Sequence, residues 1–440
     1  MNISIDPGIL SLIIFALMIV FWVMDRVPIA LIAMAGCIAC VIFGIVPFST
    51  AMSGFTNDII FLVAGMDILA QAVFKVGLAS FIGRTVSRFA KGSEKRLMII
   101  SFFASALISA FIMNITTIMI FLVIFRCLAK ESTKYNLKNL VLPMIVGVDV
   151  GGVLTLIGST PQLAGQSIIE SFQGLQGFTM FQFTPIAVVL VIACGLFVYF
   201  YSYKANLQTV AGDEAPGDSQ APDLLDNNPY GVNICEPPKK TRKEKIKTII
   251  LVGIVVMLLA LMVSGIVSLG VAAMLAAILS ILTGCISQKE AFKNLNWNIV
   301  IWLAGCFSIA AILEHTGGTD IMTAAAVAII PQAISPFLFF ALVLLVVMVV
   351  AQFVSDTACV LIFMPVFLSM SQALGISHYP IAIAIIFGAS LSYMTPLASG
   401  QIALALTVGH NFREIFRFGW PLHVLTYIVM LIVVPLFFPL

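Results

Sequence analysis

Small polar residues interrupt the middle of two long apolar stretches. The stretch 97–126 contains Met113-Asn114-Ile115-Thr116-Thr117, and the stretch 335–370 contains Ser355-Asp356-Thr357. In an apolar medium unpaired backbone groups cost several kcal/mol each, so the chain can turn only where protein or water satisfies them. A turn at either place would present helix-end amides that bind a carboxylate and carbonyl oxygens that bind a bare cation. The alternative is a continuous helix whose Ser and Thr side chains bond to the preceding turn.

Two other apolar stretches, 140–176 and 381–409, carry glycine and proline in their middle. The first contains Gly151-Gly152 followed by Ile157-Gly158-Ser159-Thr160-Pro161-Gln162, and the second contains Met394-Thr395-Pro396-Leu397-Ala398-Ser399. Glycine and proline interrupt the hydrogen-bond ladder of a helix. Their matching positions predict two broken helices that face the two turns.

The elements that hold these residues must lie in a bilayer. Hydrophobic residues make up 61% of the 440 residues and charged residues only 10%, too little polar sequence to cover a water-exposed surface. The net charge of +2 gives no reason to expect a nucleic-acid partner. The eight cysteines show neither a disulfide framework nor a zinc pattern, so we expect no metal centre of that kind and no cofactor.

The basic residues predict the topology. They flank 97–126 on both sides, whereas 315–334 and 371–380 contain no Lys or Arg. The positive-inside rule therefore makes 97–126 a re-entrant hairpin from the cytoplasm and 335–370 a hairpin from the opposite face. Both termini then lie outside and all 22 Lys and Arg lie in the cytoplasm.

The two halves of the chain also match each other. Ala51 and Gly65 align with Ala291 and Gly305 at an offset of 240 residues. We predict an all-α polytopic membrane protein of two inverted repeats, 1–204 and 247–440, each with five transmembrane helices and one hairpin. This architecture is typical of secondary transporters, whose sites lie where broken helices meet. The segment 205–246 is expected to be a flexible cytoplasmic linker, and a regulatory role for it is the alternative.

Acidic residues at membrane depth are functional candidates because buried charge is expensive. Asp149 lies two residues before Gly151, and its role there is either ion coupling or helix pairing. Asp67 matches the apolar Phe307, so a bond to a neighbouring helix is the preferred interpretation.

The hairpin tips and broken-helix motifs together resemble the divalent anion/sodium symporter family of the ion transporter superfamily, over nearly the whole chain. The resemblance implies a homodimer that moves its transport domains by an elevator mechanism. It assigns Asn114 and Gly158 to one sodium site and Asp356 and Ala398 to another. It also implies that the following residues face the substrate: Asn114, Thr116, Ser159, Thr160, Ser355, Asp356, Thr357 and Ser399.

This chain departs from the family pattern, which has Ser-Asn-Thr at each tip. Met113 and Ile115 replace two of these ligands at the first tip, and Asp356 replaces an amide at the second. A carboxylate at Asp356 opposes a dianionic substrate unless a sodium ion or a proton neutralises it.

We expect a non-enzymatic transporter in a bacterial inner membrane that couples a small organic anion, such as a di- or tricarboxylate, to sodium or protons. The alternatives are a sodium-independent exchanger or uniporter, and a cation/proton antiporter in which Asp149 and Asp356 carry the chemistry.

Overall fold

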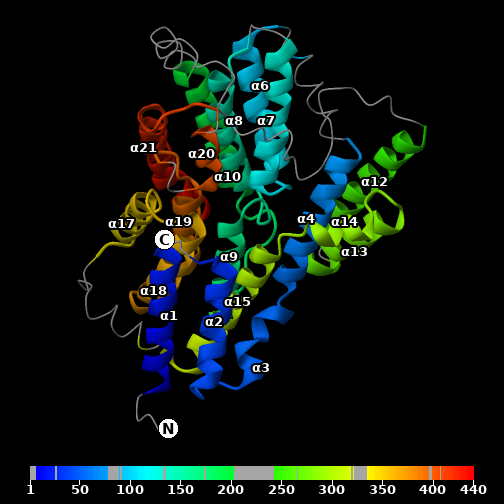
Figure 1. The fold of residues 1–440 in the computed structure, drawn as a ribbon. Coiled ribbons are helices and arrows are strands. Elements are labelled where there is room, and N and C mark those ends of the chain that lie inside the picture. Colours follow the sequence, from blue (N-terminus) through cyan, green and yellow to red (C-terminus); the bar gives the residue numbers. More distant parts are fainter. Residues whose placement is uncertain are drawn as a thin grey trace.

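The computed structural model describes residues 6–24, 27–77, 89, 92–131, 135–172, 175–202, 242–264, 266–318, 321, 334–395, 399–406 and 408–440. Every regular element in these ranges is a helix (Figure 1), so the all-α prediction is confirmed. The linker 205–246 lies outside the described residues except for its last five positions.

Helices of the first half include two short pieces of 3-10 and π geometry. They are α1 (Pro7–Met24), α2 (Ile29–Ile42), α3 (Phe48–Ala51), η1 (Ser53–Thr56), α4 (Asp58–Lys75), α6 (Glu94–Ser109), α7 (Asn114–Glu131), α8 (Leu137–Gly152), α9 (Thr160–Ser171), α10 (Thr184–Phe197) and η2 (Val198–Ser202).

Helices of the second half follow a similar order. They are α12 (Arg242–Ser264), α13 (Leu269–Leu282), α14 (Gln288–Lys293), α15 (Trp297–His315), α17 (Pro336–Val350), α18 (Asp356–Ala373), α19 (His378–Ser390), α20 (Gly400–Leu406) and α21 (Phe412–Phe437). Thus α2, α4, α7 and α9 recur as α13, α15, α18 and α20. The inverted relation between the halves remains a prediction.

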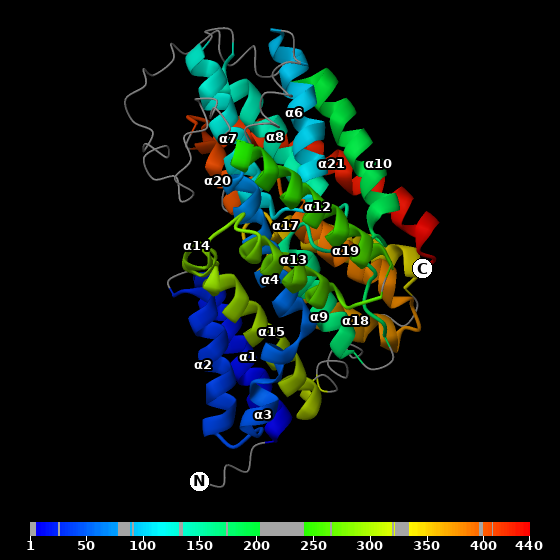
Figure 2. The same cartoon turned by 90° about the vertical axis from the view of Figure 1, so that its right-hand side faces the viewer.

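Helices of opposite halves pack in two matching pairs, α4 with α13 and α2 with α15 (Figures 1 and 2). Glycines make both approaches close. A Cβ on Gly65 would lie 2.6 Å from the carbonyl carbon of Ala273, and one on Gly305 would lie 2.6 Å from Cβ of Ala33. A larger side chain at either glycine would push the paired helices apart.

Five described helical segments are long and apolar enough to cross a membrane: Thr184–Tyr201, Lys245–Met262, Trp297–His315, Asp356–Ala373 and Phe412–Phe437. Shorter apolar helices, such as α17 and α19, accompany them. With roughly 20 apolar residues needed per crossing, these lengths fit a membrane protein.

The chain turns or breaks at four places near the centre. Residues 110–113 join α6 to α7, and residues 351–355 join α17 to α18. Residues 153–159 separate α8 from α9, and residues 391–399 separate α19 from α20. A continuous helix through either hairpin tip is therefore wrong, because the helical hydrogen bonds stop at these turns.

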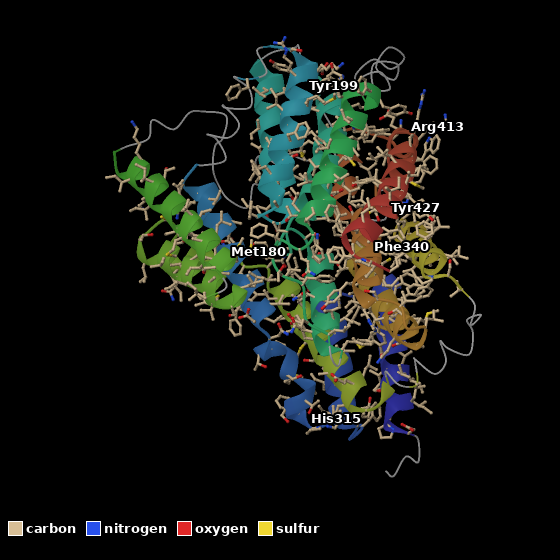
Figure 3. All side chains as sticks on the ribbon, turned by 180° about the vertical axis from the view of Figure 1, so that it is seen from behind. Met180, Tyr199, His315, Phe340, Arg413 and Tyr427 are labelled. Atoms are coloured by element: carbon tan, nitrogen blue, oxygen red, sulfur yellow. The ribbon has the colours of Figure 1, made fainter. Side chains whose placement is uncertain are left out.

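The helical segments that precede the two breaks, α8 and α19, are buried over most of their length. In α8 all residues from Asn139 to Gly152 are buried, and in α19 all from Pro380 to Ser390. Neighbouring helices surround them: α6, α7 and α10 pack against α8, and α17, α18 and α21 pack against α19 (Figure 3). The carbonyl of Met180, labelled there, accepts the amide of Leu156 at 3.0 Å and so satisfies part of the first break.

Candidate functional site

The first turns of two helices from opposite halves are in contact. The Oγ1 atoms of Thr160, in the first turn of α9, and Thr357, in the first turn of α18, lie 3.1 Å apart. Helix N-termini carry unpaired amides and partial positive charge, which favour a bound anion. This junction brings together four of the predicted substrate residues, Thr160, Thr357, Asp356 and the exposed Ser355, which directly precedes α18.

Asp356 is the first residue of α18 and is half-buried. Its Oδ1 accepts the Thr357 amide at 2.7 Å and the Thr357 hydroxyl at 3.2 Å. The carboxylate therefore engages the positive end of its own helix, which is the capping role, and it also borders the Thr160–Thr357 junction.

Asn114 and Asp149 meet on the other side of the site. Asn114 Nδ2 lies 3.4 Å from Asp149 Oδ1, and Ser109 donates to Asn114 Oδ1 at 2.6 Å. Ser109 thereby turns the amide NH₂ group of Asn114 toward the carboxylate. Asp149 is 1% exposed, and its Oδ2 has no hydrogen-bond partner in the described part of the chain.

The two acids also influence one another. Asp149 and Asp356 interact electrostatically, so a charge on one disfavours a charge on the other. A buried carboxylate with one long amide contact needs a proton or a cation to remain in such a place.

Glycines close the first break around Asn114. A Cβ on Gly152 would lie 2.4 Å from Asn114 Oδ1, and one on Gly158 would lie 2.1 Å from the carbonyl oxygen of Gly152. Gln162 Nε2 donates to the same carbonyl at 3.0 Å. The structure thus brings Asn114, Gly158 and Asp149 together, and the cation site itself remains a prediction.

The remaining predicted residues lie in or beside the first turns of α7, α9 and α20. Ser159 donates to Gln162 Oε1, and Ser399 donates to Gln401 Oε1 at 3.2 Å, so each serine engages the start of its own helix. Thr116 is half-buried in the first turn of α7. Ala398, assigned to the second cation site, lies outside the described residues.

Asp67 fits its preferred interpretation. Its Oδ2 accepts the amide of Asn296, the residue before α15, at 2.9 Å. It therefore joins α4 to α15 by a bond to a neighbouring helix.

Sequence reasoning missed the threonines that fasten each break to a hairpin tip. Thr155 donates to the carbonyl of Ala110, and Thr395 donates to the carbonyl of Gln352. The Gln352 side chain also accepts the Met394 amide at 2.9 Å. The matching place of Thr155 and Thr395 before the two serines was a signal that could have identified them.

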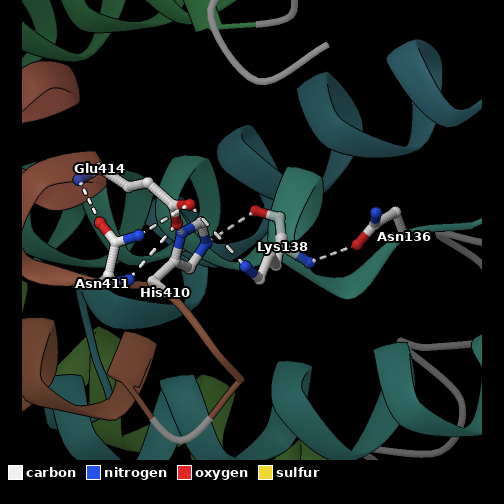
Figure 4. A network of polar contacts seen from close by, with 5 residues as sticks. All are labelled: Asn136, Lys138, His410, Asn411 and Glu414. Atoms are coloured by element: carbon white, nitrogen blue, oxygen red, sulfur yellow. Dashed lines mark hydrogen bonds and ion pairs between the residues drawn. The ribbon is translucent and has the colours of Figure 1, made fainter. Parts of the chain in front are cut away.

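A separate polar network joins α8 to α21 (Figure 4). His410 is buried in the turn before α21, with Nδ1 2.9 Å from Glu414 Oε2 and Nε2 2.9 Å from the Lys138 carbonyl oxygen. Lys138 Nζ lies 3.8 Å from Glu414 Oε1. The network links the chain that leaves α20 to the first turn of α8, so it touches both broken helices.

The family model described as citrate transporter matches residues 19–355. The chain belongs to the citrate transporter family. The matched segment contains both hairpin tips up to Ser355, together with the first broken helix. Membership of a transporter family, together with the apolar helices, makes the chain an integral membrane protein, and the prediction that it is not an enzyme is confirmed.

Two full-length relatives are transporters. An uncharacterised transporter of Haemophilus influenzae is 22% identical, over 96% of this chain and 90% of the relative. The sodium-dependent dicarboxylate transporter SdcS of Staphylococcus saprophyticus is 21% identical, over 98% of this chain and 86% of the relative. These matches confirm the resemblance predicted from the tip and break motifs.

The fold has a solved counterpart as well. The crystal structure of the YdaH transporter of Alcanivorax borkumensis superposes with a TM-score of 0.64 at 12% identity, and the match covers 98% of both chains. Its title reports an unusual topology. At this identity the likeness establishes the fold.

Proposed function

We propose that this protein is a secondary active transporter that moves a small organic anion together with a cation, either sodium or a proton. The observation that carries the proposal is the contact between Thr160 and Thr357, at which α9 and α18 begin together. Two helix N-termini with hydroxyl groups form a binding place for a carboxylate. The name of SdcS, a sodium-dependent dicarboxylate transporter, supports an organic anion as the substrate.

We assign the coupling cation to the two acids, Asp149 and Asp356. Asp149 has an unpartnered oxygen, and Asp356 lies in its electrostatic range. A cation or proton bound here neutralises charge that would otherwise repel the arriving anion, which couples the two binding events. Asn114, Asp149 and the carbonyl groups around Gly158 supply the oxygen atoms that a sodium ion requires. A proton requires only one of the carboxylates.

Transport by purified protein in liposomes tests this proposal. Radiolabelled citrate, succinate and monocarboxylates are offered under an inward sodium gradient, an inward proton gradient, or neither. We expect at least one organic acid to accumulate under one of the two gradients and only to equilibrate without it.

Other results would contradict the proposal. Equal uptake with and without gradients, or uptake only in exchange for internal acid, would identify a uniporter or an exchanger. Sodium-driven proton movement with no organic acid present would identify a cation/proton antiporter.

A further inference from the structure

The two hairpin tips have different chemistry at equivalent places. Asn114 is the first residue of α7 and Asp356 the first residue of α18. Met113 and Ser355 therefore precede their helices, and Ile115 and Thr357 follow as the second helical residues. One tip offers two hydroxyl groups, and the other offers a thioether and a branched alkyl group in the same positions.

The second tip has polar groups at the junction. Ser355 is exposed, and its side chain lies within hydrogen-bonding range of the Asp356 carboxylate, to which the Thr357 hydroxyl also donates at 3.2 Å. Thr357 contacts Thr160 at the start of α9. Once a cation or a proton neutralises Asp356, a single carboxylate placed here meets hydroxyl groups and the ends of two helices.

Polar groups around the first tip bond to one another and to the backbone. Asn114 bonds to Ser109 and Asp149, and the Thr117 hydroxyl donates to the carbonyls of Ile112 and Met113 at 3.4 and 3.5 Å. The Ile115 side chain is 53% exposed, which leaves an apolar surface beside them. Thr116 supplies one hydroxyl group in the same turn.

The charges of the tips and breaks also disfavour a substrate with a second carboxylate. The tips and the breaks, 110–117, 149–162, 351–358 and 391–401, contain two acids, Asp149 and Asp356, and no Lys or Arg. A second carboxylate of a dianion would approach these acids without a basic partner, and it would lose its hydration against Met113 and Ile115.

We infer that the transported anion carries one carboxylate group, bound where α9 and α18 begin, and an apolar remainder directed at Met113 and Ile115. This inference rests on the proposed function and narrows its substrate class. An apolar end packs against Met113 and Ile115 as a methyl or alkyl group, whereas a carboxylate there meets no Lys or Arg in residues 110–117.

A matched pair of 2-oxo acids tests the substrate class. Radiolabelled 4-methyl-2-oxopentanoate has a branched alkyl end, and 2-oxoglutarate has a second carboxylate at that end. We expect wild-type protein in liposomes, corrected for protein-free liposomes, to take up the first acid about tenfold faster or more, the usual discrimination for small changes in an apolar pocket.

Variants of the first tip test whether its residues set the preference between the two acids. Met113→Ser with Ile115→Thr gives the first tip the hydroxyls of the second, and we expect it to lower the uptake ratio of the two acids about tenfold. Leu282→Thr is the control and should keep the ratio, because Leu282 is exposed at the end of α13 and lies outside the tips and breaks. The wild-type ratio decides the question even if the double variant does not fold.

The outcomes separate this inference from the proposed function. Uptake of 2-oxoglutarate, citrate or succinate at a rate equal to or above that of 4-methyl-2-oxopentanoate would overturn the single-carboxylate substrate and leave coupled anion transport in place. Absence of gradient-driven uptake for every organic acid would overturn the proposed function itself.

Discussion

At the scale of single residues, the site combines hydroxyl groups that suit an anion with acids that suit a cation. Thr160 and Thr357 meet at 3.1 Å, and Asp356 borders this contact while bonding to the start of its own helix. Asp149 lies deeper, with one long contact to Asn114 and one unpartnered oxygen. In the proposed transport cycle, the charge state of the acids therefore decides whether the anion can bind.

Asp356→Asn tests this dependence. The amide keeps the shape of the side chain but cannot hold a charge or release a proton. We expect substrate exchange across the membrane to persist, while the sodium or pH dependence of net uptake weakens about tenfold or is lost, the scale of a charge-assisted bond. Uptake into liposomes at varied sodium concentration and varied pH measures it.

Asp67→Asn is the control for this variant. Asp67 is also an acid in a membrane helix, but it bonds to the amide of Asn296. Its variant should retain the cation dependence of the wild type. If Asp356→Asn likewise leaves both dependences unchanged, Asp356 acts only as a helix cap and coupling must be assigned elsewhere.

Residue types predicted which residues the structure brings together better than how those residues bond. The tip and break motifs identified Asn114, Thr160 and Thr357, because polar groups in apolar stretches must find partners. The sequence could not reveal that Ser109 turns the amide of Asn114 toward Asp149, since such a bond depends on side-chain rotation. Nor could it show that Ser159 bonds to Gln162 of its own helix.

At the scale of elements, the candidate site lies at the ends of the buried helices α8 and α19, and hydrogen bonds hold these ends to neighbouring segments. The Thr155 and Thr395 hydroxyls bind each break to a hairpin tip. On the far end of α8, His410 contacts Glu414 and the Lys138 carbonyl. Glycine and proline predicted the breaks, but contacts between segments hundreds of residues apart were beyond local patterns.

His410→Gln tests the link between α8 and α21. Burial lowers the pKa of His410, and the neighbouring Glu414 carboxylate opposes this shift. The folded state therefore binds a proton less readily than the unfolded chain, so the stability from this group is present above about pH 6.5 and falls as the solution becomes more acidic. The variant should lose about 1–2 kcal/mol near neutral pH and show a flatter decline toward pH 5.

Thermal unfolding in mild detergent from pH 5 to 8 measures both effects. His315→Gln is the matched control, because His315 is exposed at the end of α15. It should leave the melting profile unchanged. An unaltered profile for His410→Gln would mean that the network contributes nothing to the joint between the two helices.

At the scale of the whole molecule, the order of helices repeats and helices of opposite halves pair through glycines. An offset of 240 residues in the sequence already predicted this correspondence, because α2 and α13 occupy residues 29–42 and 269–282. The re-entrant depth of the hairpins, the inverted relation of the halves and the homodimer remain predictions, because each depends on the membrane or on a second copy.

Labelling of single cysteines tests the topology. In a cysteine-free background, cysteines at Ser93 and Tyr135 should react only from the cytoplasm, and cysteines at Ser335 and Gln372 only from outside. The reason is that basic residues flank the first hairpin on both sides and are absent around the second. Labelling of Ser93→Cys and Tyr135→Cys from opposite faces would refute the hairpin and the inverted repeat together.

The central claim is that the transported anion binds where α9 and α18 begin, and protection of Ser355 from a thiol reagent tests it most directly. Ser355 is exposed beside the Thr160–Thr357 contact, so Ser355→Cys in the cysteine-free protein should react rapidly, and a saturating transported acid should slow that reaction. Ser264→Cys, exposed near the end of α12, should react at the same rate with and without the acid. An acid that is transported but leaves both rates unchanged would place the binding site elsewhere and contradict the account.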